Sequence, residues 1–299
     1  MALRRDAVRV SVPASSANLG PMFDCAGLAL EIRDEYTAMV TDDPGVRVEV
    51  EGEGAGVVAL DDTHLVVRAM ALAFDALGER PAGFVLRCRN MIPHGRGLGS
   101  SAAAIIGGMA LARAMVTDGS QRMTDMDLLT VALALESHPD NLSAALVGGC
   151  TVAWIGDDDR ADCISVAVRP DIIPTVFVPA DALETTKARA LLAPSVTRAD
   201  AVFNIARAAL LVHALTGDPS RLFAATQDHL HQDARAEAYP ESTALLNRLR
   251  AVGVPAVISG AGPSVLAFGP IPSGIAPTWV ISTPGLAAEG AREMSIAAG

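Results

Sequence analysis

The chain contains the stretch Pro93-His94-Gly95-Arg96-Gly97-Leu98-Gly99-Ser100-Ser101-Ala102-Ala103, a glycine-rich loop that runs directly into an apolar helical segment. Its alternate glycines leave the backbone free to take positive φ, so successive N–H groups can converge on an anion. Because serine is a favoured N-cap, we expect the serine pair to cap the helix, whose unpaired N–H groups and dipole attract phosphate. The stretch therefore predicts a nucleotide-phosphate loop, and a glycine turn without a ligand is the alternative.

The segment behind this loop predicts a buried helix. From Ser101 to Val116 the residues are mostly Ala, Ile, Met and Leu, and Arg113 is the only charged residue. A Walker A loop is excluded because no lysine follows any of the glycines. A Rossmann fingerprint is disfavoured because the glycines alternate strictly and Asp118 lies just beyond the helix rather than at a following strand.

The composition fits a soluble α/β or α+β enzyme more than a nucleic-acid binder. The chain has 299 residues, 51% of them hydrophobic and 4% aromatic, with a net charge of −11. That length allows one large domain or two ordinary ones with a sizeable core. The acidic balance argues against wholesale nucleic-acid binding, and no 18-residue uncharged apolar run indicates a membrane span. Polar residues interrupt any signal-peptide core near the N-terminus, so we expect a cytoplasmic protein.

Spacing disfavours disulfide or metal-binding roles for the cysteines and a zinc site at the paired histidines. The cysteines are widely separated, lack C-x-x-C spacing and are expected to be reduced core thiols: Cys25, Cys88, Cys150 and Cys163. His229 and His231 would lie on different faces of a helix, which makes a zinc site there improbable.

Periodicity predicts a mixed-sheet α+β architecture in two layers, because helices and strands do not alternate regularly. Strands are expected at Val8–Val12, Val46–Val50, Phe84–Cys88, Cys150–Ile155, Ile164–Val168, Thr175–Val178, Pro255–Ser259, Val265–Phe268 and Trp279–Ser282. Helices are expected at Thr63–Leu77, Ser101–Val116, Asp125–Glu136, Ala182–Leu192, Ala199–Thr216 and Ser242–Val252. The acidic turn at 156–159 suggests a boundary between domains 1–155 and 156–299.

Three further polar clusters interrupt this pattern. Pro13–Leu30 is a strand end that runs into a loop rich in Ser, Asn, Gly and Asp. Glu136-Ser137-His138-Pro139-Asp140-Asn141 follows an apolar helix, and Ser259-Gly260-Ala261-Gly262-Pro263-Ser264 is a second glycine-rich turn between two strands.

Together these segments resemble the GHMP small-molecule kinases, and within them the homoserine kinases, from about Val10 to Phe268. Pro93–Ala103 is similar to the ATP loop of that superfamily, and Ser259–Ser264 to the C-terminal glycine motif that supports the loop. The Pro13–Leu30 segment, the His-Pro-Asp-Asn run and Thr185-Thr186-Lys187-Ala188-Arg189 resemble the homoserine kinases in particular.

The resemblance implies a GHMP kinase fold of class α+β. Its N-terminal ATP-binding domain would be of the ribosomal-protein S5 domain 2 type, and its C-terminal domain ferredoxin-like, with the substrate between them. The implied reaction moves the γ-phosphoryl group of ATP onto the hydroxyl of L-homoserine, and the family suggests a homodimer.

The resemblance also assigns the nucleotide and metal ligands. The expected ATP-binding residues are Pro93, His94, Gly95, Arg96, Gly97, Leu98, Gly99, Ser100, Ser101 and Ala102. A serine hydroxyl, from Ser100 or Ser101, and the carboxylate of Glu136 suit Mg²⁺, which prefers oxygen ligands. The alternative for Glu136 is an ordinary exposed acid at a helix end.

Each part of homoserine has a complementary candidate. Arg189 and Arg235 match the arginines of the family that bind the carboxylate, for which guanidinium forks are suited. Asp24, with Asn18 beside it, would bind the ammonium group, and Asn141 would orient the hydroxyl. Without the resemblance, an arginine in so acidic a protein would be read as a surface ion pair.

The group that accepts the hydroxyl proton is left open. Asn141 stands where some relatives present an aspartate and cannot accept a proton as a carboxylate does. Transfer to the phosphate itself is favoured over Asp140 as the base, because the transition state is loose. Thr185 is expected at the transferring phosphoryl group, and Gly262 at the substrate.

Several positions depart from the family pattern. Met22 and Ser137 replace usual glycines, and His64 follows Thr63 where relatives often have an asparagine near adenine, so adenine recognition is open. The alternatives are another GHMP alcohol such as mevalonate or shikimate, an NAD-dependent oxidoreductase, and a degenerate binding protein without activity.

Overall fold

The first sheet forms the larger part of the molecule. A computed structural model describes residues 3–181 and 185–295, without the side chains of 185–187. The described strands of this sheet are β1 (Val8–Ala17), β2 (Ala26–Thr41), β3 (Gly45–Gly52), β4 (Gly83–Asn90), β5 (Cys150–Ile155), β6 (Ala161–Val166) and β11 (Arg292–Met294). Their main order is β11-β1-β2-β4-β3, while β5 pairs with the start of β2 and β6 pairs with β5. The pair β3–β4 is parallel and the other pairs are antiparallel, so the expected mixed sheet is confirmed.

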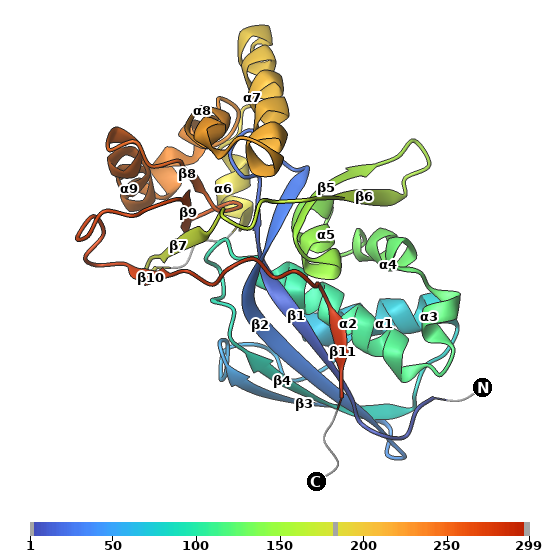
Figure 1. Cartoon of the computed structure of the whole chain (residues 1–299). Helices are drawn as coiled ribbons and strands as arrows, with labels where there is room; N and C mark the ends of the chain where they lie inside the picture. The colour runs from blue at the N-terminus through green and yellow to red at the C-terminus, as the bar shows by residue number, and fades with distance from the viewer. Residues whose placement is uncertain (1–2, 182–184, 296–299) are drawn as a thin grey trace.

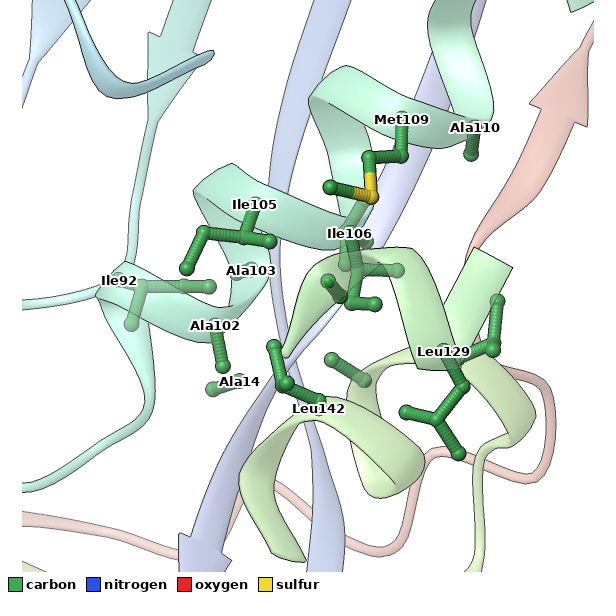
Figure 2. Close-up of a cluster of buried hydrophobic side chains, with 14 of the residues drawn as sticks. Ala14, Ile92, Ala102, Ala103, Ile105, Ile106, Met109, Ala110, Leu129 and Leu142 are labelled. Atoms are coloured by element: carbon green, nitrogen blue, oxygen red, sulfur yellow. The ribbon is translucent and has the colours of Figure 1, made fainter. Parts of the chain in front are cut away.

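The helices of the first half of the chain gather on one side of this sheet (Figure 1). They are α1 (Leu65–Leu77), α2 (Ser100–Met115), α3 (Gly119–Arg122), α4 (Asp125–Ala132) and α5 (Pro139–Val147). Side chains of α2 fill the space between the sheet and its neighbouring helices, and Figure 2 shows Ile105, Ile106 and Met109 among Ala14, Leu129 and Leu142. Ile105, Ile106 and Met109 are fully buried, which confirms the buried helix predicted behind the glycine loop. The loop is therefore anchored to the centre of the core.

The second layer is built on a smaller antiparallel sheet. Its strands, in the order β10-β7-β9-β8, are β7 (Pro174–Val178), β8 (Ala256–Ile258), β9 (Val265–Phe268) and β10 (Val280–Ser282). Its described helices are α6 (Thr185–Ala190), α7 (Arg198–Thr216), α8 (Leu222–Ala225) and α9 (Pro240–Ala251), with the 3-10 helices η1 (Pro219–Arg221) and η2 (Asp233–Ala238). Figure 1 shows this layer above one end of the first sheet, where β1 ends and β2 begins.

The chain crosses between the two layers more than once. The boundary expected after residue 155 falls between β5 and β6, which pair along their whole length in one sheet. The C-terminal strand β11 then returns to β1 and extends the first sheet. Both sheets therefore depend on residues from the second half of the chain.

The helix expected at Asp125–Glu136 is shorter than predicted. The helix from Asp125 ends at Ala132 instead of Glu136, and Pro139 begins a separate helix at its first turn. The intervening turn places Glu136 and His138 at the N-terminal end of α5. Helix α1 ends where predicted, because Gly78 takes φ 67° at its C-cap.

Helix α7 is long and apolar enough to cross a membrane by length and composition alone. A single such helix is weak evidence, since helices of soluble proteins pass the same test. Val202 and Ile205 on this helix are largely exposed.

Candidate active site

The glycine loop joins β4 to α2 and presents the first turn of that helix. Gly95, Gly97 and Gly99 take φ of 64°, 70° and 68°. Gly99 is the N-cap of α2 and supplies no side-chain cap, so the prediction that a serine caps the helix is wrong. The left-handed glycine turns the chain so that both serines lie inside the first turn. The first backbone bond is donated by Ala103 to Gly99, which leaves the preceding N–H groups at the mouth of the helix.

The second glycine turn packs directly against the first. The Ser259 hydroxyl lies 2.7 Å from the Gly97 carbonyl oxygen and 2.8 Å from the Ser16 hydroxyl. A Cβ atom on Gly97 would collide with the Ser259 carbonyl oxygen and crowd that of Gly262. The expected support of the ATP loop by this motif is confirmed as a physical contact. Gly262 itself is buried against Tyr239 and does not line the cavity described below.

The Arg96 side chain forms hydrogen bonds with backbone carbonyl oxygens. Its guanidinium donates to the carbonyl oxygens of His94 at 2.7 Å and Pro179 at 3.1 Å, and also to that of Ala180. Arg96 therefore ties the loop to the end of β7, and this contact occupies much of its hydrogen-bonding capacity.

Asp34, a residue that the sequence analysis did not single out, holds the start of the loop. It is 1% exposed, and its Oδ1 accepts hydrogen bonds from the N–H groups of Met91 at 2.6 Å and Ile92 at 2.9 Å. Its Oδ2 accepts from the Tyr36 hydroxyl at 3.0 Å. Burial raises the pKa of Asp34, and the three donors oppose that rise. An acidic residue inside a buried strand could have identified Asp34 from the sequence, but its strand, β2, was not predicted.

A cavity of about 350 Å³ lies beside the mouth of α2. Its lining includes Ser100, Ser101, His64, Asn90 and His94. A larger groove of about 610 Å³ runs along α1 and the start of β4 and includes none of the predicted site residues.

A second, smaller cavity of about 40 Å³ collects most of the predicted acceptor residues. It is lined by Ala17, Asn18, Asp24, Glu136, His138, Asp140, Asn141, Arg189, Arg235, Gly260 and Ala261. These residues come from the β1–β2 loop, the start of α5, α6, η2 and the second glycine turn. The structure thus brings segments from both halves of the chain into one small polar site.

Asp24 and Arg189 pair with each other in this cavity. Both guanidinium nitrogens of the fork donate to the carboxylate, Nη2 to Oδ1 at 2.7 Å and Nη1 to Oδ2 at 3.1 Å. Asn18 orients this pair, because its Oδ1 accepts from the Asp24 N–H at 2.9 Å while its Nδ2 donates to the Gly260 carbonyl oxygen. The hydrogen bond from Arg189 to Asp24 raises the pKa of the guanidinium.

Arg235 is a buried cation without a carboxylate partner among the residues that the structure describes. It is 1% exposed, its Nε has no hydrogen-bond partner, and its Nη1 lies 3.5 Å from His231 Nδ1. The ring of Phe23 lies between it and Arg189, with centroid distances of 5.2 and 5.5 Å to the two guanidinium carbons. Burial lowers the pKa of Arg235. A buried cation without a carboxylate partner that faces a cavity favours an anionic ligand there.

The start of α5 supplies the remaining polar groups. Asp140 is 4% exposed and accepts a hydrogen bond from the Asn141 N–H at 2.7 Å. Burial raises the pKa of Asp140 to about 7, against that hydrogen bond and with the help of the Asp24 charge. Asn141, which lines the cavity, accepts a hydrogen bond at Oδ1 from the Ser15 hydroxyl at 2.8 Å.

Glu136 and His138 form a contact at the rim. His138 Nδ1 lies 2.9 Å from Glu136 Oε1, and this contact raises the pKa of His138. Ser100, the other expected metal ligand, lines the cavity of about 350 Å³ beside α2 instead. Among the described residues, no group of three or more His, Cys, Asp or Glu side chains is arranged so that it could hold a metal ion by itself. Thr185 begins α6, but its side chain lies outside the described residues.

Comparison with known proteins gives a consistent result. Residues 64–149 match the family of GHMP kinase N-terminal domains, and residues 206–295 match the GHMP kinase C-terminal family. The homoserine kinase of Streptomyces coelicolor is 51% identical over 267 residues, which cover 89% of this chain and 86% of that one. The homoserine kinase of Clavibacter michiganensis is 48% identical over 265 residues, covering 89% and 83%.

Solved structures confirm the fold. The crystal structure of homoserine kinase from Cytophaga hutchinsonii superposes with a TM-score of 0.84 at 24% identity, covering 98% of this chain and 99% of that one. The mevalonate kinase of Leishmania major superposes with a TM-score of 0.66 at 16% identity, covering 89% and 88%.

Proposed function

Because the chain belongs to the GHMP kinases, and within them to the homoserine kinases, we propose that its glycine loop and small polar cavity hold ATP and L-homoserine for direct phosphoryl transfer. The reaction moves the γ-phosphoryl group of ATP onto the side-chain hydroxyl of L-homoserine and gives O-phospho-L-homoserine for threonine synthesis. One observation supports the choice of acceptor most strongly. Arg235 is a buried cation for which the described part of the chain offers no partner carboxylate, and it lies in the same cavity as the Asp24–Arg189 pair.

The phosphates of ATP bind at the glycine loop. The N–H groups from Gly95 to Ala102 surround the mouth of α2, where the helix dipole favours negative charge. Phosphoryl transfer depends mainly on positioning and charge stabilisation, and this loop is fixed by Ser259 on one side and Asp34 on the other.

The residues present suit Mg²⁺. The Ser100 hydroxyl and the Glu136 carboxylate are the oxygen donors that this ion prefers, and the contact with His138 occupies only one carboxylate oxygen. When bound there, the ion would neutralise phosphate charge.

L-homoserine is recognised through the two charged groups on its α-carbon. Its carboxylate binds Arg235 and, in part, Arg189, while its ammonium group binds Asp24. Because Asp24 and Arg189 already pair, the zwitterion inserts its own two charges into an existing ion pair. An acid without an ammonium group would bind the arginines and leave Asp24 without a new partner, which favours an amino acid as the acceptor.

The hydroxyl is positioned by Asn141. Its Nδ2 donates to the hydroxyl oxygen, since its Oδ1 is held by Ser15. The proton passes to a phosphoryl oxygen as the loose transition state forms, and Thr185 contacts the transferring group. Asp140 is the alternative acceptor, and its pKa of about 7 suits a base near neutral pH. Asp140→Asn separates the two routes, because a phosphate acceptor would preserve most of kcat.

An ADP-release assay tests the function. Purified protein is given Mg·ATP with L-homoserine, L-serine, mevalonate or shikimate, and we expect selective turnover of L-homoserine. Turnover of a different alcohol would retain the ATP site and refute the roles of Asp24, Arg189 and Arg235. Nucleotide binding without any turnover would indicate a degenerate binding protein. We also propose that the protein is cytoplasmic and forms a homodimer. Light scattering after gel filtration tests the dimer.

A further inference from the structure

His231, in the turn between α8 and η2, is buried beside Arg235 but does not line the small cavity. Its Nε2 lies 2.9 Å from the Gly20 carbonyl oxygen, which can only accept a hydrogen bond, so the ring carries a proton on Nε2. Burial lowers the pKa of His231, against the opposing charge of Asp228, and the ring is therefore neutral at physiological pH. A neutral ring with its proton on Nε2 has a lone pair at Nδ1.

This lone pair faces the guanidinium of Arg235. Arg235 Nη1 lies 3.5 Å from His231 Nδ1, at the long end of the hydrogen-bond range, and the guanidinium is the donor because it has no acceptor to offer. It is the one hydrogen bond that the structure records for the Arg235 side chain among the described residues, since Nε has no partner. With a proton on Nδ1, the ring would place a donor against a donor. The bond to Gly20 therefore fixes the tautomer that Arg235 requires.

The same ring also supports the aromatic residue next to Asp24. His231 and Phe23 stack with their ring centroids 5.0 Å apart and an angle of 28° between the ring planes. The Phe23 ring in turn lies between the guanidinium groups of Arg189 and Arg235. His231 is thus in contact with one arginine of the cavity and with the ring that separates the two arginines.

A buried carboxylate fixes the backbone at His231. Asp228 Oδ2 accepts hydrogen bonds from the N–H groups of His231 at 3.0 Å and Gln232 at 2.9 Å. Its Oδ1 accepts from the Leu230 N–H at 3.0 Å and from Asn204 Nδ2 at 2.8 Å. The turn that carries His231 is therefore held in place, and the direction of its ring does not depend on a ligand.

We propose that His231 is a positioning residue that orients Arg235 toward the carboxylate of the acceptor substrate, a proposal that rests on the proposed binding of L-homoserine in the small cavity. Without the acceptor at Nδ1, no protein group sets the direction of the guanidinium, and the substrate must order a long side chain when it binds. The substrate carboxylate takes no part in bond making or breaking, so its binding contributes equally to the ground state and the transition state. Loss of the orientation should therefore raise KM for L-homoserine and leave kcat nearly unchanged.

Two substitutions separate the hydrogen bonds of His231 from its packing. His231→Phe keeps a flat ring against Phe23 and removes both nitrogens, and we expect KM for L-homoserine to rise by about tenfold, with kcat and KM for ATP within about twofold. His231→Gln keeps one donor and one acceptor on its amide, and should restore KM to within about threefold of the unmodified protein. An unchanged KM in His231→Phe, or an equal rise in both variants, would overturn the proposal.

A neighbouring histidine provides the matched control. His229 also stacks on a phenylalanine, Phe203, with ring centroids 3.7 Å apart, but its side chain is 46% exposed and does not line the small cavity. His229→Phe should therefore leave KM for L-homoserine unchanged. A rise equal to that in His231→Phe would show that the effect is not specific to Arg235 and would overturn the proposal.

NMR spectroscopy tests the geometry without any substrate. In protein with isotope-labelled histidine, the signals of His231 are those that disappear in His231→Gln. We expect the neutral tautomer with the proton on Nε2, and an Nδ1 signal that moves in Arg235→Leu because its donor is lost. The opposite tautomer, or an Nδ1 signal that does not move, would overturn the proposal, and this measurement decides the case if His231→Phe does not fold.

The two readouts also separate this proposal from the proposed function. If the unmodified protein does not phosphorylate L-homoserine, the function fails, and the Nδ1 signal still decides whether His231 orients Arg235. If the protein does phosphorylate L-homoserine and His231→Phe has an unchanged KM, the orienting role alone fails.

Discussion

The two cavities next to the glycine loop and the second glycine turn differ in the kind of polar group that lines them. The small cavity contains formal charges, of which Asp24 and Arg189 satisfy each other while Arg235 lacks a carboxylate partner among the described residues. The cavity beside α2 is larger, and its lining includes the neutral amide of Asn90, whose buried Oδ1 has no hydrogen-bond partner among the described residues. An unpaired buried charge is far more unfavourable than an unpaired amide, so ligand binding should depend more strongly on the small cavity. Substitutions in it should have the larger effects.

The largest effect is expected for Arg235→Leu. We expect kcat/KM for L-homoserine to fall by about a thousandfold, since partners of buried charge pairs are worth roughly 2–5 kcal/mol, with KM for ATP nearly unchanged. The variant should also unfold at a higher urea concentration, because a buried cation is replaced by an apolar side chain. Arg248→Leu, on an exposed face of α9, is the control. A variant that is less stable but has normal activity would contradict the view that the small cavity contains an unpaired charge needed for the substrate.

Asp24→Asn is expected to have the next largest effect. It removes the proposed ammonium partner and leaves Arg189 without its carboxylate, so kcat/KM for L-homoserine should fall by about a hundredfold. Steady-state kinetics with Asp42→Asn as control measures this, because Asp42 pairs with Arg5 at the surface. An equal loss in both variants would show that the effect is not specific to the cavity.

Asp140 should make the stability of the protein depend on pH. Its folded pKa is raised to about 7 from a usual value of 3.8, so the folded state retains a proton that the unfolded state loses. Stability relative to Asp140→Asn should therefore fall as the pH rises from about 4 to 7 and level off above that range. The change should be about 3 kcal/mol in the difference between the two unfolding free energies. Urea titrations of both proteins at pH 4 and pH 8 check it, and a constant difference would refute it.

The smallest effect is expected for Asp34→Asn, at the start of the glycine loop. An amide oxygen still accepts from Met91 and Ile92, so KM for ATP should rise by about two- to threefold. Asp34→Leu removes the acceptor and should raise it by tenfold or more. Equal KM values for both variants would show that Asp34 does not shape the loop.

Local patterns predicted much of the fold. The bounds of β5 and β9 agree with the predicted strands, and α2 differs by one residue, because short apolar runs between turn signals identify such elements. Strands β2 and β11 were not predicted. Their charged and polar residues hide the alternation, and their pairing partners are distant in sequence. Helix α5 was missed because Pro139 was interpreted as part of a helix end rather than as a first turn.

The site was also predicted only in part, because local motifs can be recognised in the sequence but contacts between distant segments cannot. Motifs identified Asp24, Arg189 and Arg235, which the structure places around one cavity. The serine cap was wrong because the sequence does not reveal that Gly99 takes that position. The unsatisfied oxygen of Asn90 could not be predicted, since it depends on a contact with the Glu53 backbone on a neighbouring segment.

The contact between Ser259 and Gly97 also has a consequence for synthesis on the ribosome. The two residues are 162 positions apart, and β11, which completes the edge beside β1, lies later still. A nascent chain that ends before Ser259 contains the entire glycine loop and Asp34 but lacks the second glycine turn that packs against the loop. ATP binding should therefore begin only after most of the chain has emerged, so the nucleotide cannot assist the early folding of the first half.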